Sequence, residues 1–126
     1  MHDKAKSMSK YAIGLRGQEA AEAFLLEKGY AILVRNYRVK SGEIDLIAQH
    51  GQYIIFVEVK LRSSAVFGLP RESVGYSKQQ KIIKTAMHYI AKNKLHDQDF
   101  RFDVIEVIEI SEGTQKINHI ENAFGV

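Results

Sequence analysis

Apolar and polar residues alternate along several stretches of the chain, with the period of two that is typical of β-strands. The first three of these stretches follow one another closely and are separated only by the turn dipeptides "SG" at 41–42 and "HG" at 50–51. Strands joined by such short turns are expected to form an antiparallel meander. The predicted strands cover residues 30–39, with an irregularity at Asn36, 43–49, 52–62 and 101–110, and a fifth candidate covers 116–124.

Two other stretches repeat their apolar residues with helical spacing. The first predicted helix runs from about Arg16 to Lys28 and ends at Gly29, a residue type that commonly terminates helices. The second runs from Ser77, with Gln80 in capping-box register, to about Asn93. Its apolar side consists of Ile82, Ile83, Ala86, Met87 and Ile90, and its opposite side of Lys78, Lys81, Lys84, His88 and Lys92.

The order of these elements is helix, three strands, helix and one or two strands. It predicts an α/β fold with a mixed central sheet that is flanked by helices. Residues 11–126 show no internal repeat and no linker, and they are expected to form a single domain. The basic segment 1–10 is expected to be a flexible tail.

Composition excludes some classes of protein. The 126 residues are 45% hydrophobic and 26% charged, a globular balance, and the longest apolar run is far shorter than the roughly 20 residues of a membrane-spanning helix. We expect no membrane partner and no secretory signal. The absence of cysteine excludes disulfides and thiolate metal sites and is compatible with a cytoplasmic location, which we expect. The net charge of +3 permits a nucleic-acid partner without requiring one.

Charged residues end the third predicted strand, in which the apolar segment "IIFVEVK" (54–60) finishes with Glu58 and Lys60. By alternation these two residues share a face of the strand with Phe56. Asp45 lies in the charged alternate set of the preceding strand, and the apolar set is expected to face the core. Because a short hairpin makes the two strands neighbours, Asp45 and Glu58 are expected to share a face and lie within reach of one cation.

Two carboxylates that converge at a strand end are typical of a Mg²⁺ or Mn²⁺ site. Such an ion acidifies water and neutralises phosphate charge, and a neighbouring lysine orients the water, so these residue types suit phosphodiester hydrolysis. The same pattern arises when acidic residues and lysines on an exposed strand face form ion pairs and nothing else. Spacing alone leaves both interpretations open.

Specific motifs add a family resemblance. "GEIDLIA" (42–48) followed by "FVEVKLR" (56–62) resembles the PD-(D/E)xK nuclease superfamily, with Ile44 in the place of its proline. From about Gly14 to Val107 the chain looks like the YraN family of small bacterial proteins, and it is also similar to archaeal Holliday-junction resolvases. The further segments that carry the family resemblance are 17–30, "NYR" (36–38), "FGLPRESV" (67–74) and "RFDVI" (101–105).

The resemblance implies a restriction-endonuclease-like fold and roles for particular residues. It implies that Asp45 and Glu58 bind the metal, that the backbone carbonyl of Val59 is a further ligand, and that Lys60 is the catalytic lysine. Glu19 matches the helical glutamate that often completes such a site.

Basic residues near this site are candidates for contact with nucleic acid. Lys78 and Lys81, close to the start of the second helix, and Arg62, on the face of Glu58, are predicted to contact phosphates. A lysine row on an amphipathic helix is also the ordinary pattern of a solvated face. Both interpretations stay open.

Other polar and aromatic residues have structural interpretations. Asp103 is expected to form an ion pair with Arg101 or Arg38. Tyr76 and Tyr89 have rings that suit stacking on bases, but packing in the core or at its rim is the commoner role. None of them is assigned to the site.

Two functions from different classes follow from these observations. The first is a metal-dependent nuclease that hydrolyses DNA phosphodiester bonds, with branched or flapped DNA as candidate substrates. The second is a non-catalytic module that binds nucleic acid or protein and retains the nuclease fold. The presence of Asp45, Glu58 and Lys60 together favours the first function. A resolvase-like role would require a homodimer, because two symmetric cuts are needed.

Overall fold

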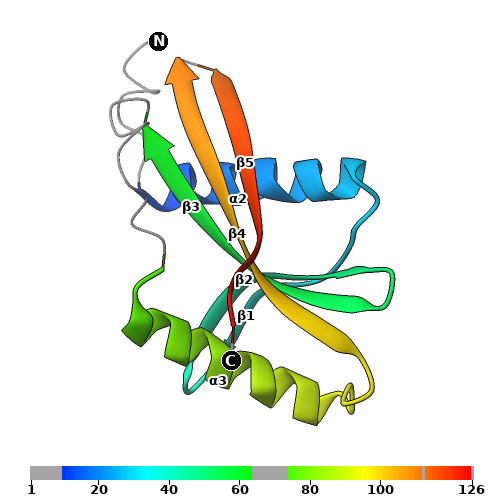
Figure 1. The fold of residues 1–126 in the computed structure, drawn as a ribbon. Helices are drawn as coiled ribbons and strands as arrows, with labels where there is room; N and C mark the ends of the chain where they lie inside the picture. The colour runs from blue at the N-terminus through cyan, green and yellow to red at the C-terminus, as the bar shows by residue number, and fades with distance from the viewer. Residues whose placement is uncertain (1–9, 64–73, 112, 126) are drawn as a thin grey trace.

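The computed structural model describes residues 10–63, 74–111 and 113–125. Its elements follow the predicted α/β order, and the fifth candidate strand is present (Figure 1). Residues 1–9 of the predicted tail (1–10) and most of the motif at 67–74 lie outside the described residues. The elements are α2 (Lys10–Glu27), β1 (Ala31–Val39), β2 (Gly42–His50), β3 (Tyr53–Ser63), α3 (Tyr76–Lys92), β4 (Asp99–Ser111) and β5 (Thr114–Phe124).

A single five-stranded sheet has the strand order β1-β2-β3-β4-β5. β1, β2 and β3 form the predicted antiparallel meander. Asn36, where an irregularity was expected, has a positive φ of 53°, but the shift in register between β1 and β2 lies between Ile32 and Val34. β3 and β4 are parallel, and the connection between them contains α3, as parallel neighbours require a crossover. β5 returns antiparallel to β4, and the sheet is mixed because its β3–β4 pair is parallel.

The two helices cover opposite faces of the sheet, at different ends of the long strands (Figure 1). On the α2 side, Ala21 and Leu25 pack against Leu46, Ala48, Ile55, Val57, Ile105 and Val107. On the α3 side, Ile82, Ile83, Ala86 and Ile90 pack against Ile44, Ile47, Ile54, Phe56, Phe102 and Val104. The expectation of one core face and one charged face is therefore wrong, because each face of the sheet packs against a helix.

Both helices begin earlier than predicted. α2 starts at Lys10, and α3 is capped by Gly75 with extended backbone and without a side-chain hydrogen bond, so Ser77 is not the cap. Gln79 takes part in this start, since its Nε2 donates a 2.7 Å hydrogen bond to the carbonyl of Val74. The predicted faces of α3 are confirmed: the lysine row is exposed and the opposite side is buried. None of the helices in the described ranges has the length and apolar character to cross a membrane.

A buried polar network joins β4 to β5. Asp103 is fully buried and accepts two hydrogen bonds from Arg101, of 2.9 and 3.1 Å, which confirms the predicted ion pair. Asp103 also lies 2.7 Å from Nε2 of His119 and accepts the backbone N–H of Asn122. The hydroxyl of Tyr30 accepts a further hydrogen bond from Arg101, so this network also ties the residue just before β1 to the sheet.

Candidate functional site

The sheet forks between β2 and β3. Pairing of these strands ends at Leu46 and Val57, after which β3 continues beside β4. Extending the antiparallel register by one step would place Asp45 directly opposite Glu58. Like charges in that position destabilise a strand pair, which gives a physical reason for the separation. The two acidic residues therefore lie where the strands part.

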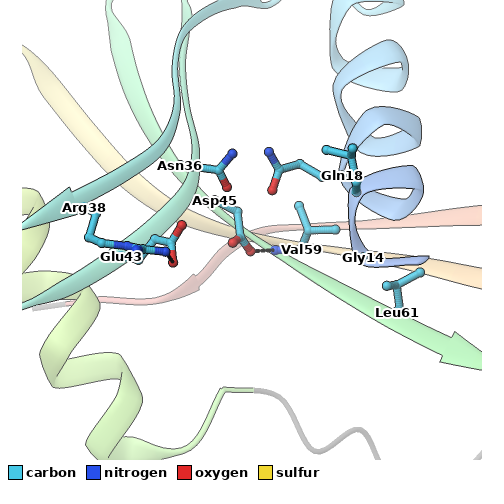
Figure 2. Close-up of a pocket in the computed structure, with 9 residues that line it drawn as sticks. Gly14, Gln18, Asn36, Arg38, Glu43, Asp45, Val59 and Leu61 are labelled. Carbon is cyan, nitrogen blue, oxygen red and sulfur yellow. Dashed lines mark hydrogen bonds and ion pairs between the residues drawn. The ribbon is translucent and has the colours of Figure 1, made fainter. Parts of the chain in front are cut away.

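Asp45 lies on the β2 side of this fork. Its Oδ2 accepts a 2.8 Å hydrogen bond from the backbone N–H of Val59 (Figure 2). This N–H therefore lies on the edge of β3 that faces β2. In a strand, the N–H and C=O of one residue point to the same edge, so the carbonyl of Val59 is also directed toward the fork. Asp45 and Val59 both line a cavity against α2.

Glu58 approaches the fork from the opposite face of the sheet. Glu58 is 5% exposed. It follows Val57, which packs in the α2-side core, so the Glu58 side chain points to the α3 side. Its Oε2 lies 2.5 Å from Nζ of Lys78, in the first turn of α3. Lys78 was predicted to contact phosphate, and in this structure it is the partner of a predicted metal ligand.

The prediction that Asp45 and Glu58 share one face is thereby corrected. Alternation does not hold through β2, because Ile44 and Ile47 both pack in the α3-side core. Asp45 is turned toward the α2-side cavity, whereas Glu58 is bonded to α3. The gap between the strands, rather than a common face, makes them neighbours.

The charges at the fork are incompletely balanced. Burial raises the pKa of Asp45 to about 7, and repulsion from Glu58 acts in the same direction. The N–H of Val59 and the ammonium of Lys78 act against this rise without cancelling it. Burial lowers the pKa of Lys78, but its hydrogen bond and attraction to Glu58 outweigh burial, and the pKa is raised. Lys78 therefore stays charged at neutral pH, and the acid pair still favours a second cation.

Lys60 and Arg62 lie further along β3, on the side of Glu58. Lys60 is half-buried and has no hydrogen bond or ion pair with any residue in the described ranges. The Nε of Arg62 lies 3.6 Å from Oε2 of Glu106, a buried carboxylate that also accepts a 2.8 Å hydrogen bond from Asn118. The ammonium of Lys60 is thus not engaged by any residue in the described ranges, whereas Arg62 lies close to the carboxylate of Glu106.

On α2, the structure brings Gln18 and not Glu19 to the site. Gln18 lines the cavity beside Asp45, whereas Glu19 is exposed. The signal was present in the sequence: Gln18 precedes the buried Ala21 and Leu25 by three and seven residues, a spacing that places all three on one side of a helix. The family resemblance instead implied Glu19, one position further along the chain.

The cavity between α2 and the fork has a volume of about 490 Å³. In Figure 2 the side-chain amides of Gln18 and Asn36 face one another across it, with Asp45 and Val59 beneath them. Arg38 and Glu43 lie at one end and are joined by a 3.1 Å ion pair. The sequence motif "NYR" contained Asn36 but gave no reason to place it at the site.

The residues at the fork fit a hard divalent cation. The available donors are carboxylate oxygens of Asp45 and Glu58 and the carbonyl of Val59, the oxygen ligands that Mg²⁺ and Mn²⁺ prefer. No group of three or more acidic or histidine side chains with metal-ligand geometry occurs among the residues that the structure describes. Such a set is not required, since Mg²⁺ is usually held by one or two carboxylates together with waters and substrate phosphate.

The fold and this site define a class: a small α/β protein whose forked sheet brings two carboxylates together beside a cavity. Its sequence matches the family described as "Uncharacterised protein family UPF0102" over residues 17–107. The chain belongs to this family, and the YraN-like resemblance is confirmed.

Relatives in several bacteria match most or all of the chain. It is 48% identical to the UPF0102 protein of Caldanaerobacter subterraneus subsp. tengcongensis, over 94% of this chain and 99% of that protein. Identity is 53% with the UPF0102 protein of Clostridioides difficile, over 86% and 92% of the two chains. The UPF0102 protein of Clostridium acetobutylicum is 46% identical over the full length of both.

Proposed function

We propose that this protein is a Mg²⁺- or Mn²⁺-dependent nuclease that hydrolyses DNA phosphodiester bonds. The observation that carries the proposal is the fork, where Asp45 and Glu58 meet with too little positive charge to neutralise both. Membership of the PD-(D/E)xK superfamily would account for the same arrangement. Branched and flapped DNA are the candidate substrates.

In this proposal Asp45, Glu58 and the Val59 carbonyl hold the ion, which when bound acidifies water and neutralises charge on the phosphate. The backbone N–H of Val59 fixes the orientation of the Asp45 carboxylate. Lys60, half-buried and beside Glu58, positions the attacking water and stabilises negative charge that develops at phosphorus. Hydrolysis adds the water oxygen to phosphorus and releases one strand end as the leaving group.

The proposal is tested by incubating the protein with linear, flapped and four-way DNA in Mg²⁺, Mn²⁺ or chelator. Cleavage is expected only with a metal ion. Asp45→Ala, Glu58→Ala and Lys60→Met are each expected to lower the rate by at least about 100-fold, because each removes a group that acts on the transition state.

Asp97→Asn removes an exposed acidic group outside the sheet and is the matched control, for which full activity is expected. Glu19→Gln tests whether the exposed glutamate of α2 supports the site. Cleavage that survives both Asp45→Ala and Glu58→Ala would refute the assignment.

The non-catalytic alternative has one observation in its favour. Lys78 already supplies Glu58 with a cation, so the fork is partly neutralised without a metal ion. Specific binding of branched DNA without cleavage in any metal would support this alternative and contradict the nuclease proposal.

A further inference from the structure

The cavity beside the fork has apolar side chains that are accessible to solvent. Leu15 and Leu61 are 40% and 39% exposed, and both line the cavity together with Val59. Ligand pockets commonly combine apolar walls of this kind with a few convergent polar groups, in volumes of about 300–1,000 Å³. The cavity, at about 490 Å³, is large enough for a nucleobase together with part of its sugar.

Two of the convergent polar groups are neutral side-chain amides. Gln18 from α2 and Asn36 from β1 direct their amides toward one another across the cavity (Figure 2). Each amide offers both donors and an acceptor, which is the pattern that recognises the hydrogen-bonding edge of a base. The backbone of Asn36 has a φ of 53°, a conformation that asparagine tolerates better than most residues.

Without a metal ion, the charges of the cavity are unfavourable for a phosphate. Arg38 is the cation among the described lining residues, and its guanidinium is engaged by Glu43 at 3.1 Å. Glu43 and Asp45 place two acidic groups on the same wall. Carboxylates repel phosphate but accept hydrogen bonds from the exocyclic amino group of a base. The lining therefore favours the base of a nucleotide over its backbone.

We propose that this cavity binds the base of an unpaired nucleotide, with Leu15 and Leu61 against the faces of the base and the amides of Gln18 and Asn36 on its edge. A base within a duplex is not accessible to such a pocket, so the bound nucleotide must be single-stranded, bulged or splayed out of its stack. This inference rests on the proposed nuclease function and extends it. The protein would recognise its substrate by an unpaired nucleotide next to the scissile phosphate.

The test uses the full chain in chelator, so that binding is measured without cleavage. A DNA duplex with one bulged 2-aminopurine is compared with the same sequence fully paired. Transfer of the 2-aminopurine from its stack into an apolar cavity should raise its fluorescence several-fold, and the bulged DNA should bind more tightly than the paired DNA. Gln18→Met and Asn36→Gly should each weaken binding of the bulged DNA by about tenfold and leave binding of the paired DNA unchanged.

These variants are chosen to keep the fold. Methionine retains the length and helix propensity of Gln18, and glycine adopts the positive φ of Asn36 without strain. Gln80→Met, on the exposed part of α3, is the matched control and should behave as wild type. Unchanged fluorescence with equal affinity for both DNAs would overturn the inference even if the protein cleaves DNA. An equal loss for bulged and paired DNA in the variants would also overturn it.

The outcomes separate this inference from the nuclease proposal. A fluorescence rise that depends on Gln18 and Asn36, without cleavage in any metal, would support base binding and refute nuclease activity. Cleavage of paired and bulged DNA with equal efficiency and no fluorescence change would support nuclease activity and refute base binding.

Discussion

Asp45 is the residue whose chemistry depends most on its surroundings. Burial and the charge of Glu58 raise its pKa to about 7, so the folded protein holds the Asp45 proton more tightly than the unfolded chain, where aspartate titrates near about 3.9. The stabilisation that comes from this proton is complete below the unfolded pKa and is lost as the pH rises through the folded one.

A stability prediction follows for Asp45. Metal-free protein should lose stability between about pH 4 and about pH 8, and Asp45→Asn should remove most of this loss, which is at most about 4 kcal/mol. The asparagine oxygen can still accept the Val59 N–H. Urea unfolding in chelator over this pH range measures the effect, and parallel stability curves for the two proteins would contradict it.

Lys78 would compete with a metal ion for the carboxylate of Glu58. Its ammonium, 2.5 Å from Glu58, has to release that carboxylate oxygen when a divalent ion takes it. Lys78→Met should therefore tighten Mn²⁺ binding by roughly fivefold, a modest factor because Lys78 is half exposed. Titration followed by the electron paramagnetic resonance of free Mn²⁺ gives the affinity. Lys81→Met is the control, and weaker binding in Lys78→Met would show that Lys78 assists the metal instead.

At the scale of elements, α2 approaches β3 closely at Gly17. A Cβ there would lie 2.6 Å from Cδ2 of Leu61, whereas a Cβ at Gly14 would meet nothing within 4 Å. Gly14→Ala should gain about 1 kcal/mol from helix propensity, and Gly17→Ala should gain less because Leu61 has to move. Thermal or urea unfolding compares the two variants.

Since Leu61 lines the cavity, Gly17→Ala should also weaken binding of bulged DNA. An unchanged affinity would argue against a role for this wall of the cavity.

The contact between β4 and β5 depends on Asp103. Burial raises the pKa of Asp103, but hydrogen bonds from His119, Arg101 and the backbone of Asn122 outweigh burial, and the pKa is lowered. The stabilisation is thus present above the unfolded pKa and is lost as the pH falls below it.

Asp103→Asn should cost about 3 kcal/mol at pH 7, because it removes the buried carboxylate that pairs with Arg101 and leaves that charge only the exposed Glu121 as an acidic partner. The difference from wild type should shrink in acid, as the pH falls through the lowered pKa of the wild-type Asp103 carboxyl. Chemical unfolding at pH 7 and at successively lower pH tests this, with the exposed Asp99→Asn as control. A loss that is independent of pH would contradict the electrostatic explanation.

At the scale of the whole molecule, the arrangement of positive charge matters more than the net charge of +3. Lys78 is bonded to Glu58, while Lys81 and Lys84 are exposed on the same helix. If Lys81 contacts phosphate, Lys81→Gln should weaken binding of all DNAs alike and reduce the slope of log affinity against log salt concentration by about one. Binding measured between low and moderate salt tests this. An equal effect of Lys92→Gln, at the other end of α3, would indicate a diffuse attraction rather than a specific contact.

The sequence was informative where local periodicity decides the structure. Alternation and turn dipeptides predicted the order of the strands and the meander, and helical spacing predicted both faces of α3. The sequence also predicted an ion pair of Asp103 with Arg101 or Arg38, and the structure pairs it with Arg101. Helix starts were less well predicted, since Gly75 caps α3 through its backbone and leaves no side-chain signal.

By itself, the sequence determined the elements of this protein, its family, and the acidic and basic residues that its proposed chemistry needs. Only the tertiary structure decided that β2 and β3 separate after Leu46 and Val57, that Asp45 and Glu58 meet through that gap from opposite faces, and that Lys78 and Gln18 join them. The physical reason is that periodicity describes one element at a time. Sheet twist, charge repulsion and packing between elements that are distant in sequence determine where a strand separates from its neighbour. They also determine which helix residue reaches the gap between the strands.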